Sequence, residues 1–291
     1  MKALNFTCSR IFALSLVLLC ASVTAGTKPL WQTLPPTPKL PNPTASGYAK
    51  VNGAEIWYAE FGKGKPVILL HGGLANANYF GDLVPVLDKK YRVIVMDTRG
   101  HGRSSNDGQQ LTYKLLSSDV VGLMDHLKIF KAAVIGWSDG AIVGLDMAMQ
   151  YPKRLTRVFA FAANSNPSGV KDTSKSPVFQ TFSARTKKEY QALSPTPNGY
   201  VKFSKNVTTM WATHPDFTKQ ELAKIHTPVW IVDGDHDEAI KRSDTEFLAN
   251  SIPGARLVIQ KNVSHFSFLQ NPKQFDYDVL AFLKAESPEN D

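Results

Sequence analysis

Short apolar runs recur along most of the chain, and longer stretches with helical spacing separate them. The runs are rich in Val, Ile, Leu, Phe and Ala, and apolar and polar positions do not alternate within them. They span residues 66–70, 91–96, 133–135, 157–161, 228–232 and 255–259. Strands that are apolar on both faces are typical of a parallel sheet covered by helices on both sides. The pattern therefore predicts an α/β protein with a mostly parallel sheet.

Two further strands are predicted before the first of these runs. Residues 48–51 and 55–58 flank Asn52-Gly53, and both turn positions tolerate the positive φ that a two-residue hairpin requires. With this hairpin the predicted sheet has eight strands. Helical spacing over residues 115–127 and 141–149 supplies two of the helices expected to cover it.

The alternation of strands and helices is interrupted once, between about residues 164 and 225. This insert contains several large side chains, namely Phe179, Phe182, Tyr190, Tyr200, Phe203, Met210 and Trp211. An insert at this point is expected to lie over the carboxyl edge of the sheet, where ligands bind. The aromatic side chains either form a small core of their own or contact a ligand, and the two interpretations are compatible. We predict a core of residues 47–164 and 226–286, with a small cap insert of residues 165–225.

One serine stands between two glycines where a predicted strand meets a predicted helix. The sequence there is Gly136-Trp137-Ser138-Asp139-Gly140. Gly-x-Ser-x-Gly in this context is the nucleophile elbow, a turn so tight that bulk at either flank would clash. The hydroxyl then lies at a helix N-terminus, where amide dipoles favour developing negative charge. We predict that Ser138 is a catalytic nucleophile.

A serine nucleophile needs a base, and the base needs a carboxylate that orients it. The chain order expected for this elbow is serine, then acid, then histidine. His265 follows the last predicted strand, from which a loop can reach the elbow, and it is the expected base. It is preferred over His214 in the insert, His226 before a strand, and His236, which we expect to be buried in an acidic loop.

The acid is expected in the loop after the preceding strand, which offers four carboxylates. The loop turns first at Gly234, so Asp237 is best placed to reach the base, with Asp235 as the alternative. The spacing of Asp233, Asp235 and Asp237 also begins like a calcium-binding loop. Glu238 stands where that loop requires glycine, and a strand precedes it instead of a helix, so no metal site is expected.

The oxyanion of an acyl-transfer reaction needs two backbone donors. We expect one from the amide of Asp139 and the other from Gly73, in the loop after residue 70. His71 is expected to be a structural hydrogen-bonding partner, and residues 97–104 are expected to form a loop that supports the site. Substrate contacts are expected from side chains near the nucleophile and in the insert, namely Asp139, Trp137, Leu74, Phe179, Phe182 and Trp211.

The first 25 residues differ from the rest of the chain. Lys2 and Arg10 precede an apolar run over residues 11–19, and small residues lead to a cleavage site after Ala25, which is the pattern of an export signal peptide. The run is too short to span a bilayer comfortably, so no stable membrane anchor is expected after cleavage. Residues 26–46 contain six prolines and are expected to form an extended tether. We predict a secreted or periplasmic protein.

Composition and charge narrow the possible partners. The 291-residue chain has 43% hydrophobic residues, enough for one large core, and a formal net charge of +8. Its basic residues are spread along the chain without a nucleic-acid-binding motif, so no nucleic-acid partner is expected. Both cysteines, Cys8 and Cys20, lie in the predicted signal peptide, so no disulfide is expected in the mature chain.

As a set, the motifs resemble those of the α/β-hydrolase superfamily. The motifs are His71-Gly72-Gly73, Asp97-x-Arg99-Gly100-His101-Gly102-x-Ser104, the elbow, Gly234-x-x-Asp237 and the late His265. The resemblance extends from about residue 48 to residue 283 and implies the α/β-hydrolase fold with a Ser-His-Asp triad and no cofactor. The expected activity is cleavage of a small-molecule carboxylic ester or lactone. A catalytically silent binding protein on this fold is the non-enzymatic alternative.

The elbow region, residues 136–152, is similar to that of one branch of the superfamily, the valacyclovir-hydrolase-like (biphenyl-hydrolase-like) serine hydrolases. This branch cleaves α-amino-acid esters, and the resemblance implies that Asp139 holds the substrate ammonium. Ala141 departs from the branch, because a third glycine is usual there. An aminoacyl-ester hydrolase or aminopeptidase is therefore the alternative activity. In the opposing interpretation, Asp139 turns away and bonds to the loop of residues 99–104.

Overall fold

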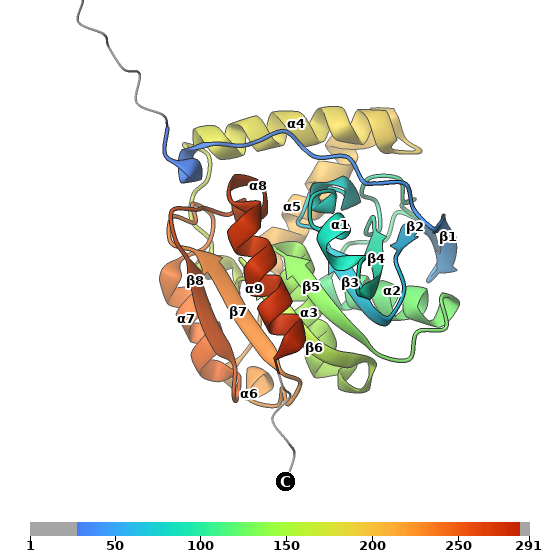
Figure 1. The fold of residues 1–291 in the computed structure, drawn as a ribbon. Helices are drawn as coiled ribbons and strands as arrows, with labels where there is room; N and C mark the ends of the chain where they lie inside the picture. Colours follow the sequence, from blue (N-terminus) through green and yellow to red (C-terminus); the bar gives the residue numbers. More distant parts are fainter. Residues whose placement is uncertain (1–27, 286–291) are drawn as a thin grey trace, which may run out of the picture.

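The computed structural model describes residues 28–285, which form one eight-stranded sheet with helices on both faces (Figure 1). The strands are β1 (Ala45–Val51), β2 (Ala54–Phe61), β3 (Lys65–Leu70), β4 (Tyr91–Met96), β5 (Ala132–Trp137), β6 (Leu155–Phe161), β7 (Val229–Gly234) and β8 (Arg256–Gln260). Their order is β1-β2-β4-β3-β5-β6-β7-β8. β2 pairs antiparallel with both β1 and β4, and the other neighbouring pairs are parallel. The predicted eight-stranded, mostly parallel sheet is confirmed.

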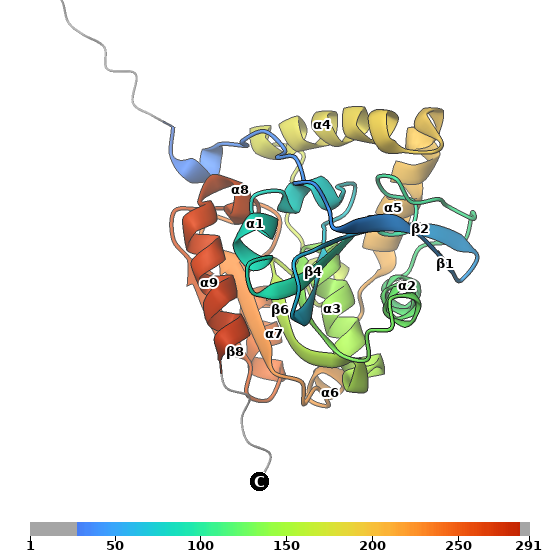
Figure 2. The same cartoon turned by 45° about the vertical axis from the view of Figure 1, so that its right-hand side comes forward.

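Helices cover both faces of the sheet because the central strands are apolar on both faces. The helices outside the insert are α1 (Val84–Leu87), α2 (Tyr113–His126), α3 (Asp139–Gln150), α6 (Lys219–Leu222), α7 (Arg242–Ser251), α8 (Ser267–Gln270) and α9 (Pro272–Lys284). Along β4, Ile94 and Met96 join the apolar cluster that includes α2, α3 and α7, whereas Val93 and Val95 join the cluster that includes α1, α8 and α9. This alternation follows from the two-residue period of a strand and gives the layers seen in Figure 2. Within residues 28–285, no helix is both long and apolar enough to cross a membrane.

The N-terminal segment, residues 28–44, is extended, and its middle part packs against the rest of the molecule. It contains one short 3₁₀ turn, Leu30–Gln32, and β1 begins at Ala45, inside the range expected to be a tether. It runs beside α4 (Pro177–Leu193), as Figure 1 shows, and Leu34 and Leu40 pack against the core. A segment with these contacts is part of the folded body and not a loose tether. The predicted signal peptide lies outside the described residues.

Two helices of the insert, α4 and α5 (Tyr200–Thr213), lie at the end of the molecule to which the parallel strands point their carboxyl ends (Figure 1). The predicted cap range of residues 165–225 extends further than these helices. Its last helix, α6, lies at the opposite end and packs against α7. The physical reason is that β7 is parallel to β6, so the chain must return to the amino-terminal edge of the sheet before β7 begins. We use the term cap for residues 177–213.

The large side chains of the insert divide between the two interpretations that the sequence left open. Tyr190 and Phe203 stack with ring centroids 4.7 Å apart, and they join Met210 in the core cluster. Phe179 and Trp211 instead line a cavity beside the elbow. Tyr190, Phe203 and Met210 therefore extend the main core into the cap, whereas Phe179 and Trp211 form part of a cavity wall.

Candidate active site

Ser138 occupies a strained turn between β5 and α3. Its φ of 53° and ψ of −118° are rare for a residue with a side chain. The flanking glycines allow the turn: a Cβ on Gly136 would collide with the main chain at Gly140, and a Cβ on Gly140 would collide with the carbonyl of Leu70. The N–H of Ser138 donates to the carbonyl of Phe161 at 2.8 Å, which ties the turn to β6. The result is a serine at the carboxyl edge of the sheet and at the start of a helix.

On one side of this serine, His265 and Asp237 form a buried pair. His265 Nδ1 lies 2.8 Å from Asp237 Oδ2. The other carboxylate oxygen, Oδ1, accepts hydrogen bonds from the amides of Ala239 at 2.6 Å and Ile240 at 2.7 Å. Burial lowers the pKa of His265, which favours the neutral imidazole that a general base requires. Backbone groups thus fix the carboxylate, and the carboxylate fixes the ring.

The other candidates of the acidic loop lie elsewhere. Asp235 Oδ1 accepts from the amide of Val263 at 3.4 Å and lies 4.0 Å from His236 Nδ1. The prediction that His236 is buried is wrong, because 41% of its side chain is exposed and its ring packs edge-on against Trp31, with centroids 4.6 Å apart. The acidic composition of the loop did not reveal that this residue points outwards.

On the other side of Ser138, the carboxylate of Asp139 lies at the cavity wall. Its Oδ1 accepts from the Tyr113 hydroxyl and from Trp211 Nε1, both at 2.9 Å, and its Oδ2 accepts from Trp211 Nε1 at 2.9 Å. Burial raises the pKa of Asp139 to about 6, although these donors act in the opposite direction. The side chain therefore does not bond to the loop of residues 99–104. Its partners come from α2 and from the cap helix α5.

The loop after β3 approaches the elbow closely. A Cβ on Gly72 would lie 3.1 Å from Ser138 Cβ, and one on Gly73 would lie 2.5 Å from Asp139 Oδ2. His71 Nδ1 lies 2.7 Å from the carbonyl of Gly72, and its Nε2 accepts from the amide of Thr98 at 3.0 Å. Burial lowers the pKa of His71 to about 4, so this ring is neutral and holds the loop as a hydrogen-bonding partner.

The loop of residues 97–104 is held by buried charges. Asp97 accepts from the amides of Ala77 and Arg103, both at 2.7 Å. Arg99 is fully buried and forms a two-point pair with Asp119, at 2.8 and 2.7 Å. These contacts fix the loop beside the one that follows β3.

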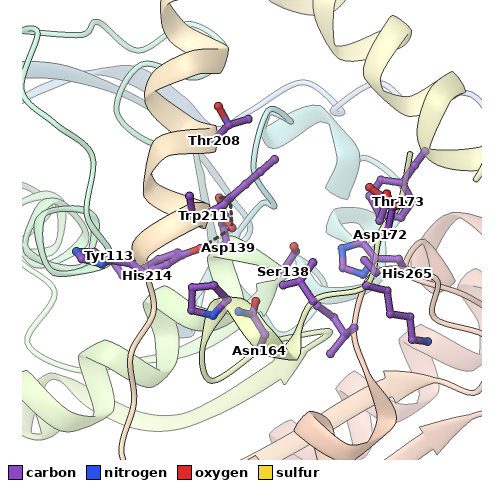
Figure 3. Close-up of a pocket in the computed structure, with 17 residues that line it drawn as sticks. Tyr113, Ser138, Asp139, Asn164, Asp172, Thr173, Thr208, Trp211, His214 and His265 are labelled. Atoms are coloured by element: carbon purple, nitrogen blue, oxygen red, sulfur yellow. Dashed lines mark hydrogen bonds between the residues drawn. The ribbon is translucent and has the colours of Figure 1, made fainter. Parts of the chain in front are cut away.

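A cavity of about 470 Å³ opens beside the elbow, and both Ser138 and His265 line it. In Figure 3, Ser138 lies between Asp139 on one side and His265 on the other. Of the six side chains expected to contact substrate, Asp139, Phe179 and Trp211 line the cavity. A cavity of this size suits a small molecule.

The other three expected contacts do not line this cavity. Trp137 is 1% exposed, because it points from the end of β5 into the apolar layer beneath the site, where its ring lies 4.7 Å from that of Phe268. Phe182 packs in the same layer, 5.0 Å from the ring of Phe266. Leu74 has a φ of 62° and packs against the opposite apolar cluster.

Several cavity residues were not identified from the sequence, namely Tyr113, Asn164, Lys171, Thr208 and His214. Thr208 and Trp211 are three apart on α5, a spacing that places them on one face of the helix. Nothing in the sequence near Tyr113 indicated that α2 would bring it to the elbow.

Lys171 donates from Nζ to the main-chain oxygen of Asp237 at 2.5 Å. Among residues 28–285, no cluster of three or more His, Cys, Asp or Glu side chains could hold a metal ion.

Several known proteins are similar to this chain in sequence. A family model described as "alpha/beta hydrolase fold" matches residues 65–199. Serine hydrolase BPHL of Homo sapiens is 28% identical over 262 residues, which cover 82% of this chain and 86% of that protein. The 3-oxoadipate enol-lactonase 2 of Acinetobacter baylyi is 26% identical over 253 residues, which cover 78% of this chain and 92% of that protein.

Solved structures agree with this likeness at the level of the fold. An enol-lactonase from Burkholderia xenovorans has a TM-score of 0.66 and 24% identity, and the match covers 82% of this chain and 100% of that one. A meta-cleavage product hydrolase from Pseudomonas fluorescens has a TM-score of 0.71 and 21% identity, with 81% and 97% covered. The sheet order, the strained Ser138 turn and these similarities lead to one conclusion: the chain has the α/β-hydrolase fold and is similar in sequence to hydrolases of that fold.

Proposed function

We propose that this protein is a serine hydrolase that cleaves a small-molecule carboxylic ester or lactone through Ser138, His265 and Asp237. One observation carries the proposal. A strained serine and a buried, carboxylate-oriented histidine line the same cavity. Two relatives, named a serine hydrolase and an enol-lactonase, support ester or lactone cleavage.

In the proposed reaction, His265 removes the proton of Ser138 as the hydroxyl oxygen attacks the acyl carbon. The amides of Gly73 and Asp139 stabilise the oxyanion, and such donors contribute most when they are aligned in advance. His265 then protonates the leaving group, and a water molecule repeats the two steps on the acyl-enzyme. Asp237 keeps the imidazole in the tautomer whose Nε2 is free to accept a proton.

The experiment is a hydrolysis panel on purified protein. It compares p-nitrophenyl esters of increasing acyl length with simple γ-lactones, each with wild type and with Ser138→Ala. We expect at least one ester or lactone class to be hydrolysed by wild type alone. Turnover that survives in Ser138→Ala would refute Ser138 as the nucleophile. No turnover of any ester or lactone, together with ligand binding, would instead support the silent binding protein.

The second candidate activity is hydrolysis of aminoacyl esters or peptides with a free amino terminus. The observation that favours it is the carboxylate of Asp139 at the cavity wall, where both of its hydrogen-bond donors, Tyr113 and Trp211, are neutral. A substrate ammonium would supply the missing positive charge, with a charge-assisted hydrogen bond of about 1.5–3 kcal/mol.

This second activity is tested by Asp139→Ala on an aminoacyl ester and on the matching ester without the amine. Amine recognition predicts a loss in kcat/KM of about 10-fold or more for the aminoacyl ester alone. Equal losses on both esters would leave the simple ester or lactone hydrolase as the activity.

We also propose that the protein is exported and that its mature form begins near Gly26. The pattern of basic, apolar and small residues in positions 1–25 supports this. N-terminal sequencing of the protein from the periplasm or medium tests it, and a chain that retains Met1 in the cytosol would contradict it.

A further inference from the structure

The indole of Trp211 reaches from the cap to both loops that carry the proposed oxyanion donors. Its Nε1 donates to both carboxylate oxygens of Asp139, at 2.9 Å each. Its ring lies so close to Gly73 that a Cβ there would collide with the ring carbon Cζ2. One side chain of α5 therefore contacts the residue after the nucleophile and the glycine of the facing loop.

These contacts bear on the reaction because the two amides belong to segments far apart in the sequence. Gly73 follows β3, and Asp139 begins α3. An oxyanion site works only if both N–H groups already point at the place where negative charge develops. An indole packed on one segment and bonded to the other opposes their separation and opposes rotation of Asp139.

The position of the carboxylate depends on few contacts. Asp139 is 7% exposed, and a buried carboxylate that loses a hydrogen bond is strongly destabilised. Tyr113 supplies one hydrogen bond from α2, and Trp211 supplies the contacts from the cap. Without Trp211, we expect the carboxylate to turn toward water in the cavity and to carry its own backbone with it.

We propose that Trp211 is a positioning residue for the oxyanion site, through which the cap aligns the Asp139 and Gly73 amides. The inference rests on the proposed function. Trp211 acts through these two residues and does not itself donate to the oxyanion. The cap is thereby part of the machinery that accelerates the reaction, in addition to forming a wall of the cavity.

The experiment measures how fast a fluorophosphonate probe labels Ser138, since this reagent needs no knowledge of the natural substrate. In labelling, the Ser138 oxygen forms a bond to phosphorus, the P–F bond breaks, fluoride leaves, and His265 accepts the serine proton. The phosphoryl oxygen acquires negative charge in the same place as the oxyanion. The maximal labelling rate and the probe concentration at half-maximal rate are measured separately, and peptide mapping identifies the labelled residue.

Three variants and one matched control separate the contacts. Trp211→Phe keeps a ring but loses the N–H, Trp211→Ala loses both, and Tyr113→Phe removes the other donor to Asp139. Trp230→Phe is the control, because Trp230 is a buried tryptophan of β7 that packs on Phe282, away from the cavity. Circular dichroism and thermal unfolding check that each variant is folded.

We expect the maximal labelling rate to fall about 10-fold in Trp211→Phe and about 100-fold in Trp211→Ala. The larger value is at the lower end of the 10²–10³-fold cost of removing an oxyanion donor itself. Tyr113→Phe should resemble Trp211→Phe, and Trp230→Phe should stay within about 2-fold of wild type. The probe concentration at half-maximal rate should change little in the folded variants. If Trp211 only shaped the cavity, its substitution would change this concentration and not the maximal rate.

Two outcomes would overturn the inference in distinguishable ways. If wild type is labelled at Ser138 and Trp211→Ala is labelled at the same maximal rate, the positioning role is wrong and the proposed function stands. A change confined to the half-maximal concentration has the same meaning. If wild type is not labelled at Ser138, the proposed function fails and the inference fails with it.

Discussion

Two carboxylates border the site, one on each side of Ser138, and different kinds of contact hold them. On the histidine side, Asp237 accepts from backbone amides two and three residues further along its own loop. On the cap side, Asp139 accepts only from side chains in the described hydrogen bonds, Tyr113 on α2 and Trp211 on α5. The histidine side is thus built from the ends of β7 and β8, whereas the cap side joins segments 26 and 72 residues from Asp139.

The difference indicates which parts of the molecule can be substituted while the catalytic residues keep their positions. A carboxylate held by local backbone amides keeps its place whatever side chains surround it. A carboxylate held by two distant side chains moves when a substitution removes or displaces either of them. We therefore expect the histidine side to carry the reaction and the cap side to set its efficiency and its substrates.

The largest effect is expected from removing the nucleophile or the base. Ser138→Ala and His265→Ala should each lower kcat of ester hydrolysis by about 10⁴-fold or more, because members of a triad act as a unit. The double variant should be no slower than either single variant by more than a few fold. The measurement is initial-rate kinetics, with near-ultraviolet circular dichroism as a folding control. A folded His265→Ala enzyme with wild-type rates would refute the role of His265 as the general base.

The next largest effect distinguishes the two acids of the loop. Asp237→Asn should lower kcat by about 10²–10⁴-fold, since the amide favours the wrong imidazole tautomer. Asp235→Asn is the matched control and should stay within a few fold of wild type, because Asp235 contacts the amide of Val263 and not the His265 ring. A larger loss of kcat in Asp235→Asn than in Asp237→Asn would identify Asp235 as the acid of the triad.

A third effect, on stability, depends on the charge of the Asp139 carboxylate alone. Burial raises the pKa of Asp139 to about 6 from an ordinary 3.8, so between these values the folded protein binds more protons at this site than the unfolded chain. The free energy of unfolding therefore falls as pH rises from about 4 to 6. The full difference corresponds to about 3 kcal/mol.

Asp139→Asn removes this charge and keeps an oxygen that can accept from Tyr113 and Trp211. We expect the variant to be more stable than wild type by about 1–3 kcal/mol at pH 7.5, with a smaller gain at pH 4.5. Urea unfolding at the two pH values measures both. Asp125→Asn, at a side chain that is 66% exposed, is the control that should gain little at either pH. An equal gain at both values would mean that the Asp139 carboxylate is not the cause.

The same contrast explains what the sequence could and could not predict. Ser138, Asp237 and His265 each follow a strand within a few residues, so the periodic pattern located them at one edge of the sheet. The contacts of Asp139 depend on how the cap folds over that edge, and no local pattern in the sequence encodes that. Tyr113 was therefore missed altogether, although it lies on a helix whose existence the spacing did predict.

The sequence also did not predict which way two side chains near the site point. His236 was expected to be buried in the acidic loop, but the composition of a loop does not fix which way a residue points. Trp137 was expected to contact substrate because it is next to the nucleophile. The strained turn sends neighbouring side chains in different directions, and the indole enters the apolar layer beneath the site.

The smallest effect is expected where the N-terminal segment meets the cap, far from the reacting atoms. Arg185 on α4 donates from its two terminal nitrogens to the carbonyls of Pro35 at 2.6 Å and Leu34 at 2.9 Å. On the same helix, Glu189 accepts from the hydroxyl of Thr37 at 2.5 Å. Because α4 also carries Phe179, whose ring lies 5.4 Å from that of His265, these contacts hold one wall of the cavity in place.

Arg185→Ala should loosen this segment while the hydrogen bonds of Asp237 and His265 stay as they are. We expect a loss of about 1 kcal/mol or less in the free energy of unfolding, typical of a few partly exposed hydrogen bonds. Amide hydrogen exchange should accelerate in residues 30–40 and α4, and KM should rise a few fold while kcat stays near wild type. Lys187→Ala, at an exposed position on the same helix, controls for the loss of a surface cation. If kcat fell with KM unchanged, the segment would affect the reacting groups themselves, and a role limited to the cavity wall would be wrong.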